Sequence, residues 1–408
     1  MVCITKFIAI YIIEMRELNS DLMYKVNDYM GDIECTHMDG RIEYHPHYYK
    51  ELQDYTHILV INRFTISEET LFSSVLLSIC GNTHRVSLVG NTASKFSYCD
   101  FFNSKIDRWD TSRVTNMSCM FSGATFFNQP LERWDTSRVT DKSGMFAGAT
   151  SFNQPLDGWD TSRVTNMGSM FSGATSFNQP LKRWDTSRVA NMGSMFMGAT
   201  SFNQPLEGWD TSRVLYMSDM FGGAITFNQP IGMWDTSSVI DMSGMFGDTP
   251  IFNQPIEGWD VSEVTDMEEM FNGATSFNQP LGNWDTSGVN CMAWMFYEAK
   301  VFNQPLEGWN VSMVTDTRWM FCHATKFNQP LTRWDINRVT NMWGMLGNTP
   351  SFEQSLKGWI TTKVTDMYGV YNGVAPLNNS MKYRSSFRLS YVHPLCTLPI
   401  MYPSVDGH

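Results

Sequence analysis

The chain has 408 residues, a formal net charge of −12 and a pI near 5.1, so as a whole it lacks the basic surface that nucleic acids and anionic membranes bind. Its eight cysteines lie at irregular spacings with no CxxC pair, which excludes a zinc-ribbon pattern and favours a reducing, intracellular setting. The apolar run from Phe7 to Ile13 is too short for a transmembrane helix and lacks a cleavage site, so we predict neither a signal peptide nor a membrane span.

Residues 1–55 are predicted to form an N-terminal helical extension. Apolar residues recur at every fourth position from Leu18 to Met30, and Asn19 or Ser20 can serve as the N-cap of an amphipathic helix. The same stretch resembles the first helix of an F-box, whose pattern is LPxELxxxIxxYL, with asparagine in place of the proline. The matching positions are Leu18, Asp21, Leu22, Val26, Tyr29 and Met30. The resemblance implies a substrate adaptor that binds an Skp1-type subunit of a ubiquitin ligase, and the alternative is a simple capping helix.

Two strands are predicted next, over residues 56–62 and 83–91, with a helical stretch around residues 68–79 between them. Both strands begin with Thr-His, which indicates degenerate outer coils of a repeat array. In the frame of the later repeats, Val89 and Phe96 occupy positions normally held by valine and phenylalanine. We therefore assign residues 56–101 to degenerate N-terminal cap coils, which solenoids need for solubility.

A 25-residue repeat then runs without insertion or deletion over residues 102–375. Its copies, which we number as coils 1 to 11, are marked by Trp109, Trp134, Trp159, Trp184, Trp209, Trp234, Trp259, Trp284, Trp309, Trp334 and Trp359. Fixed-period self-similarity of this length is the signature of a solenoid. One coil has too few apolar side chains to offset the entropy of ordering it, so the coils must fold as one array. Residues 376–408 lack the repeat and are predicted to be a C-terminal cap or a disordered tail.

Positions within a coil are counted from its tryptophan. Met, Met, Phe and Ala at offsets +8, +11, +12 and +15 follow the spacing of a short helix, with Asn or Asp at +7 as its N-cap and Gly at +14 near its end. Offsets +1 to +6 alternate between constant and variable residues, which predicts a short parallel strand with the odd offsets facing inward. The sequence therefore predicts an α/β solenoid in which each coil has one strand and one helix.

Two recurrent polar side chains are predicted to have structural roles. Asn at −6, as in Asn128, is placed to hydrogen-bond the backbone of the next coil, because the proline at −4 keeps this leg out of a paired strand. Asp at +1, as in Asp135, precedes Thr-Ser and suits an Asx turn in which the carboxylate accepts backbone N–H groups. A calcium ladder is the alternative for this aspartate, but no GGxGxD loop is present. Methionines at fixed offsets are interpreted as core residues.

The pattern FNQPLxxWDTSxVTxMxxMFxGA resembles the 25-residue repeats of the BspA-like group, found in mycoplasma and other bacterial surface proteins and in proteins of large DNA viruses and some protists. The resemblance implies a leucine-rich-repeat-like solenoid. In bacteria it also implies a lipid-anchored or secreted surface protein that binds host or matrix partners. This chain departs from that form, because Cys3 has no preceding lipobox and no anchor is visible. An intracellular location is therefore predicted, in the host cytoplasm if the source is viral, with the cell surface as the alternative.

No catalytic constellation is visible, so we predict that the protein is not an enzyme and has no cofactor and no metal site. Seven of the eight histidines lie outside the repeats, and no Ser/His/Asp or HExxH spacing occurs. His45 and His47 offer two metal ligands without a third, which favours a solvated loop. The predicted function is a non-enzymatic scaffold for protein–protein interaction through the solenoid face.

The predicted binding residues are arginines at offset +4 in coils 1 to 5, with threonines at +2 beside them. They are Arg113, Arg138, Arg163, Arg188 and Arg213, and Thr111, Thr136, Thr161 and Thr186. Outward positions of stacked strands would place the guanidinium groups about 5 Å apart, which is self-repelling unless negative charge lies against them. That charge comes either from acids at offset −2, such as Asp157 and Glu207, or from a bound acidic protein segment or polyanion. The row ends after Arg213, and this asymmetry favours a binding surface over coils 1 to 5.

Overall fold

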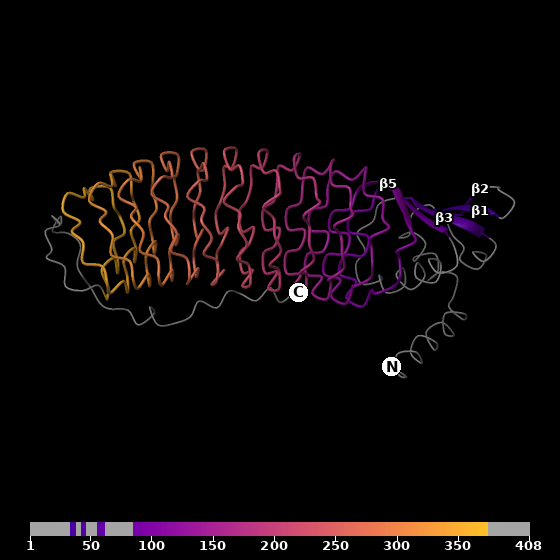
Figure 1. Ribbon diagram of the computed structural model, residues 1–408, viewed down its shortest axis with the longest axis horizontal. Helices are drawn as coiled ribbons and strands as arrows, with labels where there is room; N and C mark the ends of the chain where they lie inside the picture. The colour runs from indigo at the N-terminus through magenta and orange to yellow at the C-terminus, as the bar shows by residue number, and fades with distance from the viewer. Residues whose placement is uncertain (1–32, 38–41, 46–54, 62–84, 374–408) are drawn as a thin grey trace, which may run out of the picture.

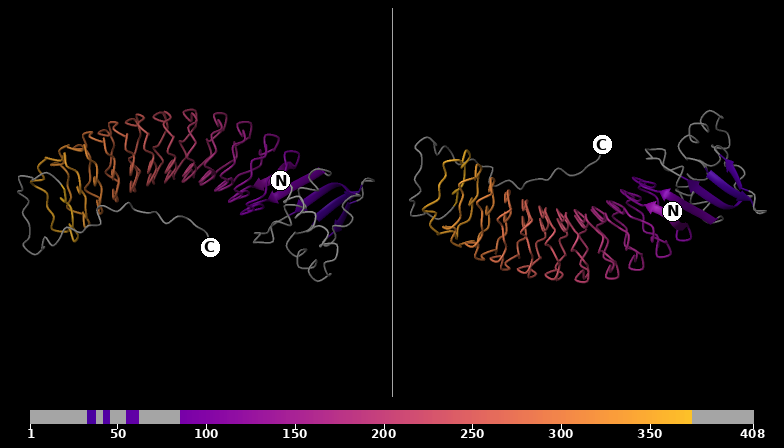
Figure 2. Two further views of the ribbon diagram at one scale, coloured as in Figure 1. Left: turned by 90° about the horizontal axis from the view of Figure 1, so that it is seen from below. Right: turned by 90° about the horizontal axis from the view of Figure 1, so that it is seen from above.

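A computed structural model describes residues 33–37, 42–45, 55–61 and 85–373 of the chain (Figure 1). These residues form a small sheet at one end, followed by a curved stack of coils (Figure 2). The predicted helix over residues 18–30, the helical stretch around residues 68–79 and the tail at residues 376–408 lie outside the described residues.

The sheet has five strands in the spatial order β2-β1-β3-β4-β5. β1 (Ile33–His37) lies antiparallel between β2 (Ile42–His45) and β3 (Tyr55–Ile61), whereas β3, β4 (Arg85–Asn91) and β5 (Asp110–Asn116) are parallel. The two strands predicted before the repeats are present as β3 and β4. β5 covers offsets +1 to +7 of coil 1, so the sheet leads directly into the repeat array.

Beyond β5, neighbouring coils meet through single parallel bridges at offset +7. The bridges run in unbroken register from Asn116 with Asp141 to Asn341 with Asp366. The register follows from the constant period, because an insertion in any coil would shift every later contact. The chain therefore forms the tandem repeat array that its sequence predicts.

The short helix predicted at offsets +8 to +15 is absent. The described residues contain no helix, and this segment is a series of turns in every coil. In coil 3 the amide of Met170 donates to Met167 O of its own coil at 3.1 Å, whereas the amide of Phe171 donates to Met195 O of the next coil at 2.9 Å. Donors that alternate between coils cannot belong to a helix, whose donors all point along its own axis. The prediction of one strand and one helix per coil is therefore wrong, although the residues of the predicted stripe are the buried ones.

Left-handed backbone conformations keep this segment from being helical. Offsets +10 and +14 have positive φ in every coil, as at Ser169 (φ 56°) and Gly173 (φ 67°) in coil 3. Glycine adopts this region without steric penalty. The glycine at +14 therefore turns the chain towards the next leg, and it does not end a helix as the sequence analysis predicted.

The strand predicted at offsets +1 to +6 exists as β5 in coil 1 and is replaced by turns in later coils. In coil 3 the amide of Val164 donates to Thr161 O at 2.9 Å, which closes a turn at offsets +2 to +5. Thr161 and Val164 are buried, whereas Asp160 and Arg163 face solvent. The prediction that odd offsets face inward is therefore wrong at +1, because the chain turns there and a period of two does not hold.

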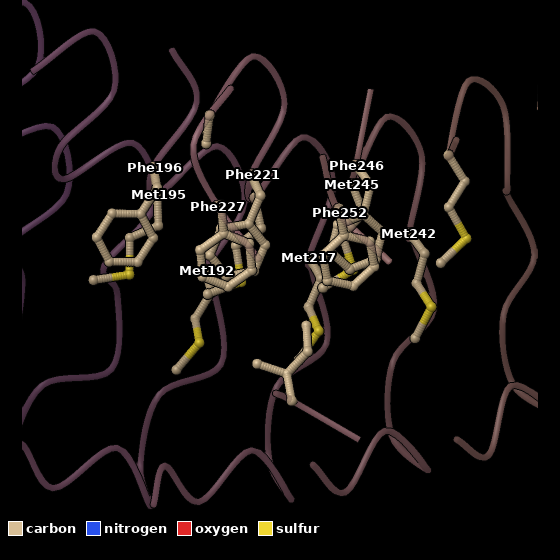
Figure 3. Close-up of a cluster of buried hydrophobic side chains, with 14 of the residues drawn as sticks. Met192, Met195, Phe196, Met217, Phe221, Phe227, Met242, Met245, Phe246 and Phe252 are labelled. Carbon is tan, nitrogen blue, oxygen red and sulfur yellow. The ribbon is translucent and has the colours of Figure 1, made fainter. Parts of the chain in front are cut away.

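Aromatic rings stack along the array and form its core (Figure 3). The rings of Phe221 and Phe227 lie 3.9 Å apart and within 8° of parallel. Phe221 also stacks on Phe246 of the next coil, with 5.9 Å between centroids. Met217 and Met242 are fully buried beside these rings, as the sequence analysis predicted for methionine. Each aromatic pair contributes about 0.5–1.5 kcal/mol beyond its buried area, so every added coil strengthens the stack.

Side-chain hydrogen bonds tie each coil to the next and confirm both predicted polar roles. Asn128 Oδ1 accepts from the amide of Asn153 at 3.0 Å and from Gln154 Nε2 at 2.9 Å. Asp160 Oδ1 accepts from the amide of Ser162 at 2.9 Å and from its hydroxyl at 2.7 Å, which is an Asx turn. The indole N–H of the tryptophan in coils 2 to 11 donates to the carbonyl at −3 of the preceding coil. Among the described residues, these bonds leave only Trp109 Nε1 and Lys142 Nζ as buried side-chain nitrogen or oxygen atoms without a hydrogen-bond partner.

Candidate interaction surfaces

The outward side chains of the array form rows, because the same offset recurs in every coil and adjacent coils lie about 5 Å apart. Most buried offsets hardly change from coil to coil, whereas several outward offsets, such as +4 and +10, change in chemistry along the stack. Two groups of outward residues therefore define candidate surfaces. One is the arginine row at +4 in coils 1 to 5, and the other is a group of acids and aromatic rings at +7 to +14 in coils 5 to 11.

The arginine row consists of Arg113, Arg138, Arg163, Arg188 and Arg213, which are all exposed. Within the described part of the chain, none of the five forms an ion pair within 4.0 Å, so the acids at −2 do not supply the opposing charge. Asp160 has a lowered pKa, chiefly because Ser162 donates two hydrogen bonds to its carboxylate and to a smaller extent because of Lys142 and Arg163. The row is thus weakly compensated and open to an outside partner, and its role in binding stays a prediction.

The four threonines predicted beside the arginines are not surface residues. Thr111, Thr136, Thr161 and Thr186 are only 1–2% exposed. Each hydroxyl donates to the carbonyl at +1 of the next coil, as Thr136 does to Asp160 O at 2.8 Å. Threonine is accommodated at this inward position because its hydroxyl satisfies a carbonyl of the neighbouring coil. A partner on the surface cannot reach these side chains, so their assignment to the binding surface is wrong.

The second surface, which we name the acid–aromatic strip, has an acidic end and an aromatic end. It consists of Asp219, Asp248, Asp266, Glu268, Glu269 and Glu298 in coils 5 to 8, and of Trp294, Tyr297, Trp319, His323, Trp343 and Tyr368 in coils 8 to 11. The pKa of the Asp219 carboxyl group is raised by partial burial and then by the charges of Glu269 and Asp241. Partial burial and then Glu298 raise the pKa of Asp248. The acidic end therefore holds negative charges that destabilise one another.

The aromatic end is a continuous chain of ring contacts. The centroids of Trp294 and Trp319 lie 5.4 Å apart, and those of Trp319 and Trp343 lie 5.6 Å apart. Trp343 meets Tyr368 edge to face at 6.3 Å. Trp343 is 40% exposed and Tyr368 is 43% exposed. Adjacent exposed rings offer a ligand both apolar area and aromatic faces that attract cations.

A cation of the array, Arg318, lies inside the strip. Its Nη2 is 2.9 Å from Glu268 Oε1, two coils away, and its Nη1 is 3.4 Å from Asp316 Oδ2. Asp266, Glu268 and Cys291 also bring their ligand atoms within 4.8 Å of one another, a geometry that a metal ion can use. Arg318 already neutralises Glu268, and partial burial raises the pKa of the Cys291 thiol to about 12, so the thiol keeps its proton. The sequence-based expectation of no metal site stays a prediction.

The sequence analysis did not identify the acid–aromatic strip. Most of its residues occupy offsets +9, +10, +13 and +14, which were assigned to a helix that the structure does not contain. A usable signal was the appearance of tryptophan at +9 or +10 in coils 8 to 10, where coils 2 to 4 have only serine and glycine. Large aromatic residues in place of small ones at an outward offset are typical of an interaction surface.

The shared core, the unbroken register and the varied outward rows define this protein as a tandem-repeat array. The chain belongs to the family described as "Mycoplasma protein of unknown function, DUF285", whose sequence model matches residues 70–181, 154–254, 204–300, 228–324 and 279–386. These overlapping matches cover all eleven coils. No curated protein and no solved structure matches the chain. The described part of the chain contains no helix with the length and apolar character that crossing a bilayer requires.

Proposed function

We propose that this protein is a non-enzymatic repeat scaffold that binds another protein through the outward side chains of its array. The observation that carries the proposal is the contrast between a core that repeats in every coil and an outward row at offset +4 that changes along the stack. Folding of the array needs only the repeated core, so stacking does not account for five exposed arginines in succession. On a chain with a net charge of −12, this row is a local basic surface suited to recognition.

An acidic protein segment is the partner chemistry that fits the arginine row. Guanidinium groups bind carboxylates through two parallel hydrogen bonds. Unit charges about 5 Å apart repel by roughly 0.8 kcal/mol per neighbouring pair in water, before screening by salt. This cost is small enough for the free protein to keep the row, and a negative partner would relieve it at each coil. We therefore place the partner over coils 1 to 5.

Affinity capture followed by mass spectrometry tests this proposal. The wild-type chain should retain an acidic protein partner from a cell lysate, and the Arg138→Ser/Arg163→Ser/Arg188→Ser variant should retain much less of it. The three side chains are exposed and make no ion pair among the described residues, so the variant should fold normally. Circular dichroism and the melting temperature check that expectation.

A matched control removes three other exposed cations from the far end of the array. In the Lys326→Ser/Arg333→Ser/Lys363→Ser variant the net charge changes equally, but the arginine row is intact. Capture by this control should match the wild type. Equal loss in both variants would show that net charge governs retention, and no loss in either would move the binding surface elsewhere.

A substrate adaptor is a second candidate function, supported by the resemblance of residues 18–30 to an F-box helix. In that case the array would bind the substrate, and an Skp1-type subunit would co-purify with the wild-type chain but not with a Leu22→Asp variant. The irregular cysteine spacing supports the intracellular location that an adaptor needs.

A cell-surface adhesin is the third candidate, supported by membership of a family described from mycoplasma. The resemblance of the repeat to those of BspA-like surface proteins also supports this candidate. Labelling of intact cells with a membrane-impermeant reagent distinguishes a cell-surface location from an intracellular one. Modification of the exposed Lys326 and Lys363 in intact cells would favour the adhesin. Modification only after lysis would favour the adaptor or another intracellular scaffold.

A further inference from the structure

The acid–aromatic strip has no part in binding an acidic partner, because its own charge is negative. We propose that the strip docks a basic segment of this same chain, residues 382–388, which follows the last described coil. The segment reads Lys-Tyr-Arg-Ser-Ser-Phe-Arg and so combines three cations with two aromatic rings. This docking concerns a different surface and a different ligand from the proposed function, and it does not depend on that function.

Charge complementarity is the first argument for this occupant. Among the described residues, the ion pairs of the strip acids join Glu268 to Arg318 at 2.9 Å and Glu298 to Lys300 at 3.9 Å. The strip acids without an ion pair in the described part of the chain are Asp219, Asp248, Asp266 and Glu269. Besides partial burial, the charge of Glu269 raises the pKa of Asp219, and the charge of Glu298 raises the pKa of Asp248. Three cations from one segment would relieve this repulsion.

The aromatic rings are the second argument. Arginine side chains stack on exposed tryptophan and tyrosine faces, and each such contact contributes about 0.5–1 kcal/mol at an exposed site. The exposed rings of Trp343 and Tyr368 lie at the C-terminal end of the array, which the segment follows in the chain. Tyr383 and Phe387 add rings of their own between the cations. A segment of this composition matches both the aromatic end and the acidic end of the strip.

The segment is long enough to reach the strip. Gly373, the last described residue, lies at offset +14 of coil 11, the same offset as Glu298 in coil 8. Three coils at about 5 Å each place Glu298 about 15 Å back along the stack. The chain from Gly373 to Lys382 spans up to about 30 Å when extended. A tether of this length gives an effective concentration of the order of millimolar, so contacts too weak to hold a separate peptide would still form.

Zero-length carbodiimide cross-linking of the full chain tests the contact, because the reagent joins an amine to a carboxylate only when the two groups touch. We expect peptides that contain Lys382 to be joined to strip acids, above all Glu269 and Glu298. The yield should fall several-fold at high salt and in an Arg384→Gln/Arg388→Gln variant, which keeps the Lys382 amine and the strip carboxylates, since screening and loss of charge both weaken the contact. Lys363 in coil 11 is exposed and serves as the reference amine.

A mixture of ¹⁵N-labelled and unlabelled chains identifies the occupant. Cross-links within one chain that persist on dilution support the proposal. Mixed-isotope cross-links that vanish on dilution would show that the segment binds a second copy, which would overturn docking within the chain. Docking within the chain would also be overturned if Lys382 cross-linked equally often to exposed acids outside the strip, such as Glu132 and Glu207. The absence of any cross-link between Lys382 and a strip acid would overturn it too.

Hydroxyl-radical footprinting of the full chain provides a second readout that does not depend on amine chemistry. In the K382Q/R384Q/R388Q variant, oxidation of Trp343 should rise about two-fold or more, because the docked segment no longer shields the ring. Oxidation of Met233, which is 88% exposed in coil 6, should stay constant. Equal oxidation of Trp343 in the variant and the wild type would contradict docking. The arginine row is unchanged in this variant, so failure here leaves the proposed function untouched.

Discussion

The ammonium nitrogen of Lys142 lies 5.3 Å from the centroid of the Trp159 ring in the next coil. Lys142 stands at offset +8, where most coils have methionine, and its fully buried nitrogen has no hydrogen-bond partner among the described residues. Burial lowers the pKa of Lys142 to about 7, and the charge of Asp160 opposes this shift only in part. A desolvated cation–π contact contributes about 2 kcal/mol, which is less than the cost of burying an unpaired charge. Lys142 therefore destabilises the array wherever the ammonium form dominates.

Lys142→Met should stabilise the array by an amount that depends on pH. The unfolded chain holds the lysine proton up to about pH 10.5, whereas the folded chain releases it above about pH 7. Because the unfolded state binds more protons between these values, the stability of the wild type rises with pH across this window. The gain from Lys142→Met should therefore be largest below pH 7, of the order of a few kcal/mol, and should shrink towards pH 10.5. Denaturant unfolding at pH 6 and at pH 9 measures the difference.

Met167→Lys provides the matched control for that prediction, since it introduces the same group at offset +8 of coil 3. It should destabilise the array most at low pH and least at high pH. If the free energies of unfolding of Lys142→Met and the wild type differ by the same amount at pH 6 and at pH 9, the Lys142 amine does not titrate in this window.

Trp209→Ala should cost more stability than Trp359→Ala. The ring of Trp209 stacks on Trp184 and on Trp234 at 6.4 Å each, and its indole N–H donates to Leu181 O at 3.1 Å. Trp359 belongs to the last coil, so the described array contacts its ring from one side only. We expect a loss of about 3–5 kcal/mol for Trp209 and a clearly smaller one for Trp359 in thermal unfolding. Equal losses would argue against a core that stacks from coil to coil.

Asn178→Ala should break one step of the asparagine ladder. Asn178 Oδ1 accepts from the amide of Asn203 at 3.0 Å and from Gln204 Nε2 at 2.9 Å. Without this acceptor, the partly buried amide of Asn203 loses its partner, at a cost of about 1–3 kcal/mol. Asn178→Asp keeps the acceptor oxygen and should retain most of the stability. Denaturant midpoints that coincide for the two variants would show that the ladder contributes little.

Ser169→Gly should stabilise coil 3. Ser169 has a φ of 56°, where a side chain adds strain that glycine avoids, and its amide still donates to Gly193 O at 2.8 Å. The gain should be about 0.5–1 kcal/mol after allowance for the greater freedom of glycine in the unfolded chain. Ser172→Gly, in the same coil but at negative φ, should instead destabilise. Calorimetric melting of the two variants checks the contrast, and a fall in melting temperature for Ser169→Gly would show that the serine is not strained.

The repeated core could be predicted from the sequence because buried positions must recur where coils stack. The phenylalanine, methionine and tryptophan ladders and the Asn128 and Asp160 hydrogen bonds all follow from that rule. The backbone path could not be predicted in the same way. The spacing of Met167 and Phe171 is compatible with burial in a helix and equally with burial in a series of turns. The positive φ of Ser169 distinguishes the turns from a helix, but a serine in the sequence does not indicate a positive φ.

The two candidate surfaces differ in how far sequence could reveal them. The arginine row was visible because it repeats at one offset. The acid–aromatic strip was not visible in the sequence, because its tryptophans do not keep one offset: Trp294 stands at +10 and Trp343 at +9. In addition, Arg318 reaches Glu268 across two coils. Comparison of the coils identifies the residues that all coils share, whereas the residues of this strip differ from coil to coil. Only the backbone turns bring its residues to one surface.

If the array binds its partner through side chains that its core does not need, three arginines can be removed without loss of folding but with loss of affinity. The dissociation constant of the captured partner, measured against salt concentration for the wild type and the R138S/R163S/R188S variant, tests this most directly. The wild type should bind about tenfold or more tightly than the variant at low salt, and the two should converge at high salt as screening removes the advantage of the arginines. Identical dissociation constants at every salt concentration, for a variant that is fully folded, would contradict binding over coils 1 to 5.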